Sequence, residues 1–129
     1  MSNQLVNTPK HVGIILDGNR RWAKEHGKTS IEGHKAGYEA LKRVTEAAFD
    51  RGIAYVSVYV FSTENWNRKA DEVAYLMDMA LMVFKKDISR LHKQGIRVLW
   101  LGTKERLSDK HLKAINDAVE LTKNNIKGT

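Results

Sequence analysis

Residues 11–22 read HVGIILDGNRRW, a run of apolar and small residues that passes directly into Asp-Gly-Asn and two arginines. Residues 12–16 carry no polar side chain, which predicts a buried strand, and the Asp-Gly-Asn that follows is typical of a sharp turn. The polar run after the turn predicts that the chain continues as a helix. One short segment therefore predicts a strand, a tight turn and a helix start in immediate succession.

The turn at residues 17–21 combines groups that suit a phosphorylated ligand. A carboxylate such as Asp17 can hold a divalent cation, and Gly18 lets the backbone approach a ligand closely. The new helix presents unpaired N–H groups to an anion, and Arg20 and Arg21 add forked donors that match phosphate oxygens. The combination favours a magnesium and diphosphate site. The alternative is an ordinary turn in which Asp17 only caps the helix.

Apolar periodicity along the rest of the chain predicts helices and strands in alternation. The predicted helices cover residues 20–26, 34–51, 71–93 and 109–124, and the later predicted strands cover residues 53–61 and 95–102. Crossovers of this length make the strands parallel. The predicted fold class is therefore α/β, an open parallel sheet with helices on both faces, in a single domain spanning residues 1–129.

Polar loops follow all three predicted strands, at residues 17–21, 62–68 and 103–106, and each loop carries arginine. Because open parallel sheets bind ligands beyond the carboxyl ends of their strands, this topology predicts that the three loops share one rim. A sheet of three strands also leaves edges that usually find a partner. We therefore expect another chain, or a further part of a larger domain, to complete the sheet.

The predicted helix at residues 71–93 is apolar on two sides. One face carries a long row of apolar residues that suits a core. A second apolar row consists of Tyr75, Met79, Met82 and Val83. Such a helix is either packed between other elements or lines an apolar cavity.

Composition limits the class of partner. Lys and Arg outnumber Asp and Glu by 22 to 15, and the net charge of +7 favours nucleic acid, an anionic membrane surface or a phosphorylated small molecule. The absence of cysteine excludes disulfides and cysteine-based metal sites. The first ten residues lack the pattern of a signal peptide and no apolar run is long enough to cross a membrane, so we expect a soluble, cytoplasmic protein.

Several familiar catalytic motifs are absent, among them the P-loop, G-x-G-x-x-G, G-x-S-x-G and H-E-x-x-H. The five histidines have no metal-ligand spacing, and His34 is the one best placed to reach an anion. Three segments in order, HVGIILDGNRRWAK at 11–24, GHKAG at 33–37 and FSTENWNR at 61–68, resemble the cis-prenyltransferases, the family that includes undecaprenyl diphosphate synthase. The resemblance extends from His11 to about Asn124 with collinear spacing.

The resemblance implies an enzyme that condenses isopentenyl diphosphate onto an allylic prenyl diphosphate, forming a cis double bond at each addition, with Mg2+ as cofactor. It implies that Asp17 holds Mg2+ and assists the departure of diphosphate, and that Asn65 takes part in proton removal. The substrate-binding residues that it implies are Gly18, Asn19, Arg20, Arg21, Trp22, His34, Ser62, Trp66, Arg68 and Glu72. The chemistry is consistent, because ionising an allylic diphosphate needs a cation and fixed donors at the leaving group and a dry apolar cavity for the chain.

Some of these residues also have ordinary structural explanations. Trp66 could anchor a loop, Ser62 could cap a turn, and Glu72 could be a first-turn helix acid. The resemblance instead places Glu72, with the helix that follows it, in the wall of the product tunnel, which would account for the second apolar row.

Two features depart from the family pattern. Ser30 stands four residues before His34, where the family usually carries an arginine that grips diphosphate, and Lys28 or Lys35 could substitute only as point charges. The chain corresponds to the N-terminal half of the pattern. We therefore expect the allylic half-site here and the isopentenyl diphosphate half-site on a C-terminal segment that has no counterpart in this sequence.

The resemblance also sets expectations about partners. We expect a homo-oligomer, such as a dimer, or a complementing C-terminal chain, together with transient contact at a membrane surface and no nucleic acid. A non-catalytic or regulatory prenyl-diphosphate-binding relative is the alternative function. A basic nucleic-acid-binding domain is a third hypothesis that only the net charge supports.

Overall fold

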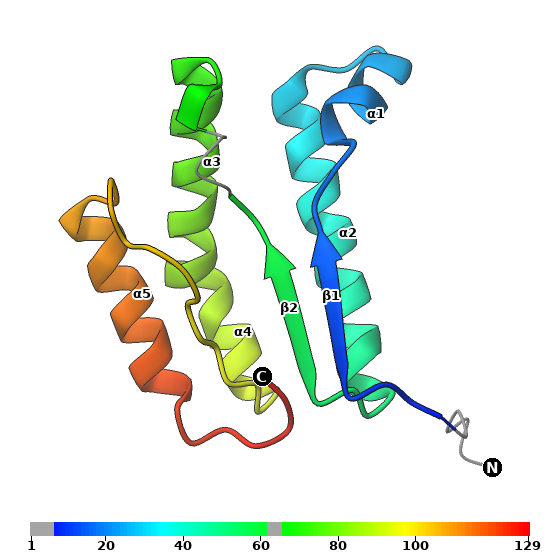
Figure 1. Ribbon diagram of the computed structural model, residues 1–129, viewed down its shortest axis with the longest axis vertical. Coiled ribbons are helices and arrows are strands. Elements are labelled where there is room, and N and C mark those ends of the chain that lie inside the picture. The colour runs from blue at the N-terminus through cyan, green and yellow to red at the C-terminus, as the bar shows by residue number, and fades with distance from the viewer. Residues whose placement is uncertain (1–6, 62–65) are drawn as a thin grey trace. The chain divides into compact units, whose positions relative to one another are not determined.

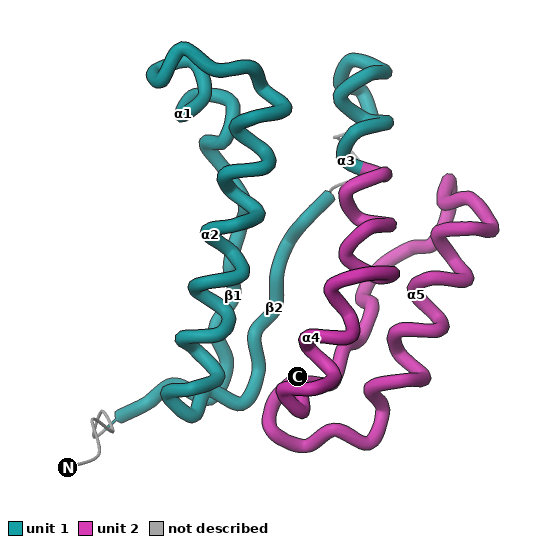
Figure 2. Tube along the Cα trace, turned by 180° about the vertical axis from the view of Figure 1, so that it is seen from behind, with its two compact units in different colours: residues 1–76 teal, residues 77–129 magenta. Residues whose placement is uncertain are grey.

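The computed structural model describes residues 7–61 and 66–129, in two compact units of residues 1–76 and 77–129 (Figure 2). The prediction of one domain over the whole chain stays a prediction.

The first unit is built on two parallel strands, β1 (His11–Ile15) and β2 (Tyr55–Tyr59), as Figure 1 shows. They pair in register from His11 opposite Tyr55 to Ile15 opposite Tyr59. Two helices, α1 (Asn19–Glu25) and α2 (Ser30–Asp50), connect the strands, and α2 packs against both α1 and β2. The prediction of an α/β fold with an open parallel sheet is confirmed.

Helix α2 begins at Ser30, four residues before the predicted start at residue 34, so residues 30–33 are helical. Thr29 caps the helix, because its side chain accepts a hydrogen bond from the Glu32 backbone N–H. The Glu32 carboxylate in turn accepts from the Thr29 backbone N–H at 2.7 Å. This reciprocal pair satisfies two N–H groups that a helix start otherwise leaves unpaired.

The long helix predicted at residues 71–93 contains an irregularity. Its parts are α3 (Ala70–Met82), the π-helical turn η2 (Val83–Asp87) and α4 (Ile88–Lys93). The last helix, α5 (Asp109–Thr122), begins at residue 109 as predicted, and the Ser108 side chain caps it by accepting a hydrogen bond from the His111 backbone N–H. The core of the second unit lies among these helices and consists of Ile88, Ile96, Ala114, Ile115 and Ala118.

The predicted third strand, residues 95–102, is wrong. Within residues 7–61 and 66–129, the only pairing of this segment is one isolated parallel bridge between Ile96 and Gly128. Two of its backbone N–H groups bond to partners that do not form a strand. The Arg97 N–H donates to the Gly128 carbonyl at 2.8 Å, and the Val98 N–H donates to Thr122 Oγ1 at 2.9 Å. A strand needs a neighbouring strand edge along its whole length, and a bridge at one residue does not supply it.

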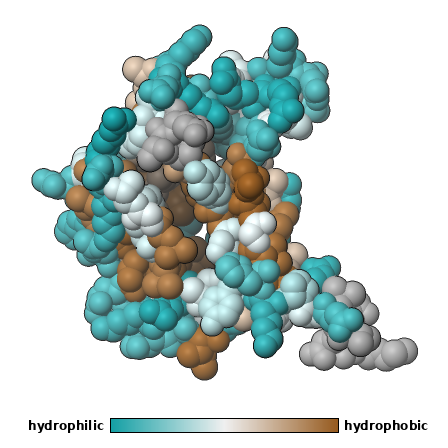
Figure 3. Space-filling view, viewed as in Figure 1, coloured by the Kyte–Doolittle hydropathy of each residue, from teal (hydrophilic) through white to brown (hydrophobic). Residues whose placement is uncertain are grey.

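Large hydrophobic side chains are exposed at the carboxyl ends of both strands. Ile15 is 76% exposed, Tyr59 59% and Val60 57%, and hydrophobic surface is visible on the face shown in Figure 3. Among the described residues, no helix is both long and apolar enough to span a membrane.

Candidate functional site

The turn after β1 is as sharp as its sequence predicts. Gly18 lies in the left-handed region at φ 84° and precedes α1, which glycine tolerates without steric cost. Its N–H donates to Asp17 Oδ1 at 2.7 Å, and Arg21 Nη2 lies 3.4 Å from the same oxygen. Both side chains of the Asp17–Arg21 pair are more than three-quarters exposed. The turn therefore presents a carboxylate and a guanidinium to solvent side by side.

Two glycines of the GHKAG segment let α1 lie directly on α2. A Cβ atom at Gly33 would stand 2.3 Å from the Asn19 carbonyl oxygen, and one at Gly37 would stand 2.3 Å from Asn19 Oδ1. Ala23 fills the same crossing and is 1% exposed. These glycines hold the start of α1 in place, a role that the sequence analysis missed. The signal was their spacing, because residues four apart share one helix face.

A buried carboxylate joins three parts of the chain. Glu72 Oε1 lies 2.9 Å from His34 Nε2 of α2 and 2.9 Å from Arg68 Nη1, and Arg20 Nε of α1 is 3.9 Å away. The side chains of Glu72 and His34 are each 9% exposed. The structure thus brings together four residues that the sequence analysis named separately, around one oxygen atom.

The Glu72 carboxyl is ionised in this surrounding. Burial by itself raises the pKa of Glu72, but the hydrogen bonds from His34 and Arg68 and the nearby charge of Arg20 outweigh it, so the pKa lies below its ordinary value of 4.5. Charge-assisted hydrogen bonds of this kind are stronger than neutral ones and fix the orientation of the groups that make them.

A groove opens beside the turn, and it lies entirely within the first unit. Its volume is about 210 Å3, and its lining combines polar residues of the turn with apolar residues of β1 and α2: Ile14, Ile15, Leu16, Asp17, Asn19, Gly37, Ala40, Leu41 and Val44. The charged end of the groove is Asp17, and the rest is almost wholly aliphatic. A groove with one charged end and an aliphatic length suits an amphipathic ligand.

The other predicted site residues are placed as follows. Trp22 stacks on His26 with ring centroids 4.3 Å apart and is 37% exposed. Trp66 meets Phe61 edge to face at 5.0 Å. Ser62 and Asn65 lie outside the described residues. The predicted loop at residues 103–106 belongs to the second unit, so its place on a common rim stays a prediction.

Asp17 fits the way in which proteins hold Mg2+. In the described part of the chain, no three His, Asp or Glu side chains cluster closely enough to hold a metal. Magnesium, however, commonly binds through one or two carboxylates together with waters and substrate phosphates. The exposed Asp17 carboxylate has the chemistry of such a ligand, and a diphosphate would have to supply further oxygens.

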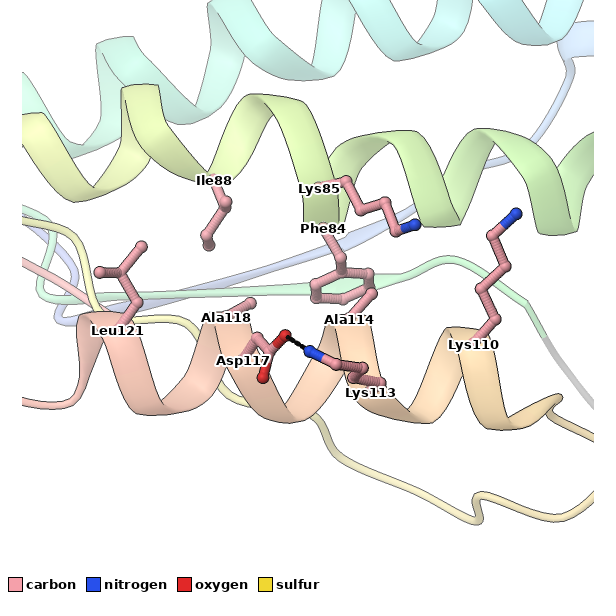
Figure 4. Close-up of a pocket in the computed structure, with 9 residues that line it drawn as sticks. All are labelled: Phe84, Lys85, Ile88, Lys110, Lys113, Ala114, Asp117, Ala118 and Leu121. Carbon is pink, nitrogen blue, oxygen red and sulfur yellow. Dashed lines mark hydrogen bonds and ion pairs between the residues drawn. The ribbon is translucent and has the colours of Figure 1, made fainter.

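A second groove lies in the second unit, between η2 and α4 on one side and α5 on the other (Figure 4). Its volume is about 310 Å3, and Phe84, Ile88 and Leu121 contribute to an apolar floor. Lys113 pairs with Asp117 at 2.6 Å along its edge. None of the predicted site residues lines this groove.

Comparison with known proteins assigns the chain to one family. The sequence profile of the undecaprenyl diphosphate synthase family matches residues 15–129. An isoprenyl transferase of Streptococcus mutans is 47% identical over 122 residues, which are 95% of this chain and 49% of that protein. A trans,polycis-polyprenyl diphosphate synthase of Thermobifida fusca, specific for (2Z,6E)-farnesyl diphosphate, is 47% identical over 94% of this chain and 43% of its own length.

Solved structures agree with this assignment. Lavandulyl diphosphate synthase from Lavandula x intermedia, in complex with dimethylallyl diphosphate, superposes with a TM-score of 0.86 at 36% identity, over 92% of this chain and 51% of that one. A protein of Campylobacter jejuni described as a probable undecaprenyl diphosphate synthase gives a TM-score of 0.74 at 25% identity, over 95% of this chain and 52% of that one. The chain therefore spans about half the length of the relatives it matches.

Proposed function

Because this chain belongs to the undecaprenyl diphosphate synthase family of prenyltransferases, we propose that it carries the allylic half-site of a cis-prenyltransferase. The reaction is the condensation of isopentenyl diphosphate onto an allylic prenyl diphosphate. The observation that carries the proposal is the groove beside Asp17, which joins an exposed carboxylate and guanidinium to an aliphatic lining. The Lavandula relative, which binds dimethylallyl diphosphate, supports this class of ligand.

The diphosphate head would bind at the turn. Arg21 stands beside Asp17 at the surface, and Arg20 approaches the buried cluster from the same helix turn. Guanidinium groups bind phosphate oxygens through paired N–H donors, and the positive end of α1 adds to the attraction. These groups neutralise the charge that develops on the diphosphate as it leaves.

The prenyl chain would lie along the groove between β1 and α2. Ile14, Leu16, Leu41 and Val44 line it, and an apolar wall lets a cationic prenyl intermediate form away from water. The groove is smaller than the roughly 300–1,000 Å3 of a typical ligand pocket. It would therefore hold only the first part of a prenyl chain.

Mg2+ would be held by Asp17 and would supply Lewis-acid stabilisation of the departing diphosphate. The residues of this chain have separate tasks. Asp17 would position the head, Arg20 and Arg21 would hold its oxygens, and His34 and Arg68 would stand behind them as further donors.

Incorporation of radiolabelled isopentenyl diphosphate with farnesyl diphosphate and Mg2+ tests the full reaction, and calorimetric binding of farnesyl diphosphate tests the half-site. We expect Mg2+-dependent binding by the wild-type chain and at least tenfold weaker binding by Asp17→Ala, about 1.4 kcal/mol or more. Lys24→Ala, an exposed cation of α1 outside the site, is the control. Binding without incorporation, even after a complementing C-terminal polypeptide is added, would support a non-catalytic, prenyl-diphosphate-binding role. Equal binding by Asp17→Ala and the wild type would refute the assignment of Asp17.

A further inference from the structure

The buried Glu72 carboxylate faces the same cations that the proposed function assigns to a diphosphate. Its Oε1 atom accepts hydrogen bonds from His34 and Arg68 at 2.9 Å each, and Arg20 lies 3.9 Å away. One oxygen thus collects donors from α1, from α2 and from the segment before α3. These side chains are separated by 14 or more residues in the sequence and converge on this atom.

A carboxylate at this position is not suited to bind diphosphate directly. Both groups are anionic and both only accept hydrogen bonds, so a direct contact between them is repulsive. Glu72 is also too deeply buried to be a wall residue that merely touches a prenyl chain. Its contacts are two guanidinium groups and an imidazole ring, all hydrogen-bond donors to anions, which points to an action through them.

We propose that Glu72 is a positioning residue whose carboxylate stands in for a diphosphate oxygen while the site is empty. It keeps Arg68, His34 and Arg20 converged on one point, and these side chains exchange it for the diphosphate when the substrate binds. This inference rests on the proposed function, since it takes the diphosphate as the ligand of that site. It replaces the role in the tunnel wall that the family resemblance implies for Glu72.

In this arrangement Glu72 competes with the diphosphate for the same side chains. Cations that are already paired bind an incoming anion less tightly than free cations, while their fixed geometry spares reorganisation during the reaction. Removing the charge of Glu72 should therefore strengthen the binding of a diphosphate and weaken its turnover. A direct ligand of substrate or Mg2+ would show the opposite effect on binding.

The test compares Glu72→Gln with the wild-type chain in calorimetric titrations with farnesyl diphosphate and with inorganic pyrophosphate, both with Mg2+. Gln keeps the shape and one acceptor oxygen, and we expect its dissociation constants to fall roughly three- to tenfold. Glu72→Asp keeps the charge, and its dissociation constants should stay within about twofold of those of the wild type. Glu39→Gln is the matched control, because Glu39 loses the same charge on α2, where it pairs with Lys42 at 3.1 Å outside the site.

A second measurement uses only the wild-type chain and does not depend on whether a variant folds. The side-chain N–H signals of His34 and Arg68 in 15N–1H NMR spectra should move as pyrophosphate and Mg2+ are added, because both groups leave Glu72. In an incorporation assay with a complementing C-terminal polypeptide, Glu72→Gln should lower both KM for the allylic diphosphate and kcat, whereas a purely structural role would lower the apparent kcat and leave KM unchanged.

The outcomes separate the two hypotheses. Absence of farnesyl diphosphate binding by the wild-type chain overturns the proposed function and this inference with it. If the wild type binds, the inference alone is overturned by weaker binding in Glu72→Gln, by equal effects of Glu72→Gln and Glu39→Gln, or by stationary His34 and Arg68 signals.

Discussion

The contact between Asn19 and Gly37 makes a sharp prediction about stability. In an ordinary helix interior, alanine is more stable than glycine by about 0.5–1 kcal/mol. At Gly37, however, a Cβ atom would stand 2.3 Å from Asn19 Oδ1, 2.6 Å from Nδ2 and 2.7 Å from Cγ. Overpacking of this kind costs about 1–3 kcal/mol. Gly37→Ala should therefore lower the free energy of unfolding by about 1 kcal/mol.

The clash is with a side chain, so a second substitution should remove it. In an Asn19→Ala background the obstructing atoms are absent, and Gly37→Ala should then raise the free energy of unfolding by about 0.5–1 kcal/mol. The sign of the effect should thus reverse between the two backgrounds. Urea denaturation followed by far-UV circular dichroism, with linear extrapolation to water, measures all four variants of this cycle.

Gly33 supplies the matched control. A Cβ atom there would meet the Asn19 backbone oxygen at 2.3 Å and Ala23 Cβ at 2.9 Å, and truncating the Asn19 side chain leaves both atoms in place. Gly33→Ala should therefore destabilise the chain by a similar amount in both backgrounds. Equal destabilisation by Gly37→Ala with and without the Asn19 side chain would refute the packing of α1 on α2 described above.

Three further predictions concern other parts of the chain. Thr29→Ala removes a capping box and should cost about 1 kcal/mol in urea denaturation, while Thr29→Ser should restore most of it; equal losses would contradict the cap. The pKa of Glu72 is lower in the folded state than its unfolded value of about 4.5. Ionised Glu72 therefore stabilises the fold above about pH 4.5, and this stabilisation is lost as the pH falls through the folded-state pKa. The free energy of unfolding, measured by urea denaturation from neutral to acid pH, should therefore fall less in Glu72→Gln than in the wild type. An identical pH dependence in the two proteins would count against an ionised Glu72. Ile115 is 3% exposed, so Ile115→Ala leaves a cavity in the core and should lower the free energy of unfolding in urea by about 2–5 kcal/mol. Ile126 is 96% exposed, so Ile126→Ala should change the same free energy by less than about 0.5 kcal/mol.

Local sequence signals predicted the elements whose stabilising partners are near in the chain. The first strand, the turn at Gly18 and the start of α5 were predicted close to their observed positions. The start of α2 was misplaced although Thr29 and Glu32 carry a capping-box signature that was readable from the sequence. The motifs also indicated the family, because their residues and order do not depend on knowing the fold.

The sequence by itself determined which residues have the chemistry for a diphosphate site: a carboxylate at the end of a strand, a glycine and two arginines. Only the tertiary structure decided how they are grouped. Glu72, in the first turn of α3, lies 38 residues from His34 of α2 and meets it only in the folded chain. The third predicted strand failed because the described neighbours offer it a single bridge. Periodicity reports which face of an element is apolar, but the partner of a buried charge or of a strand edge depends on contacts between distant segments, which no local pattern contains.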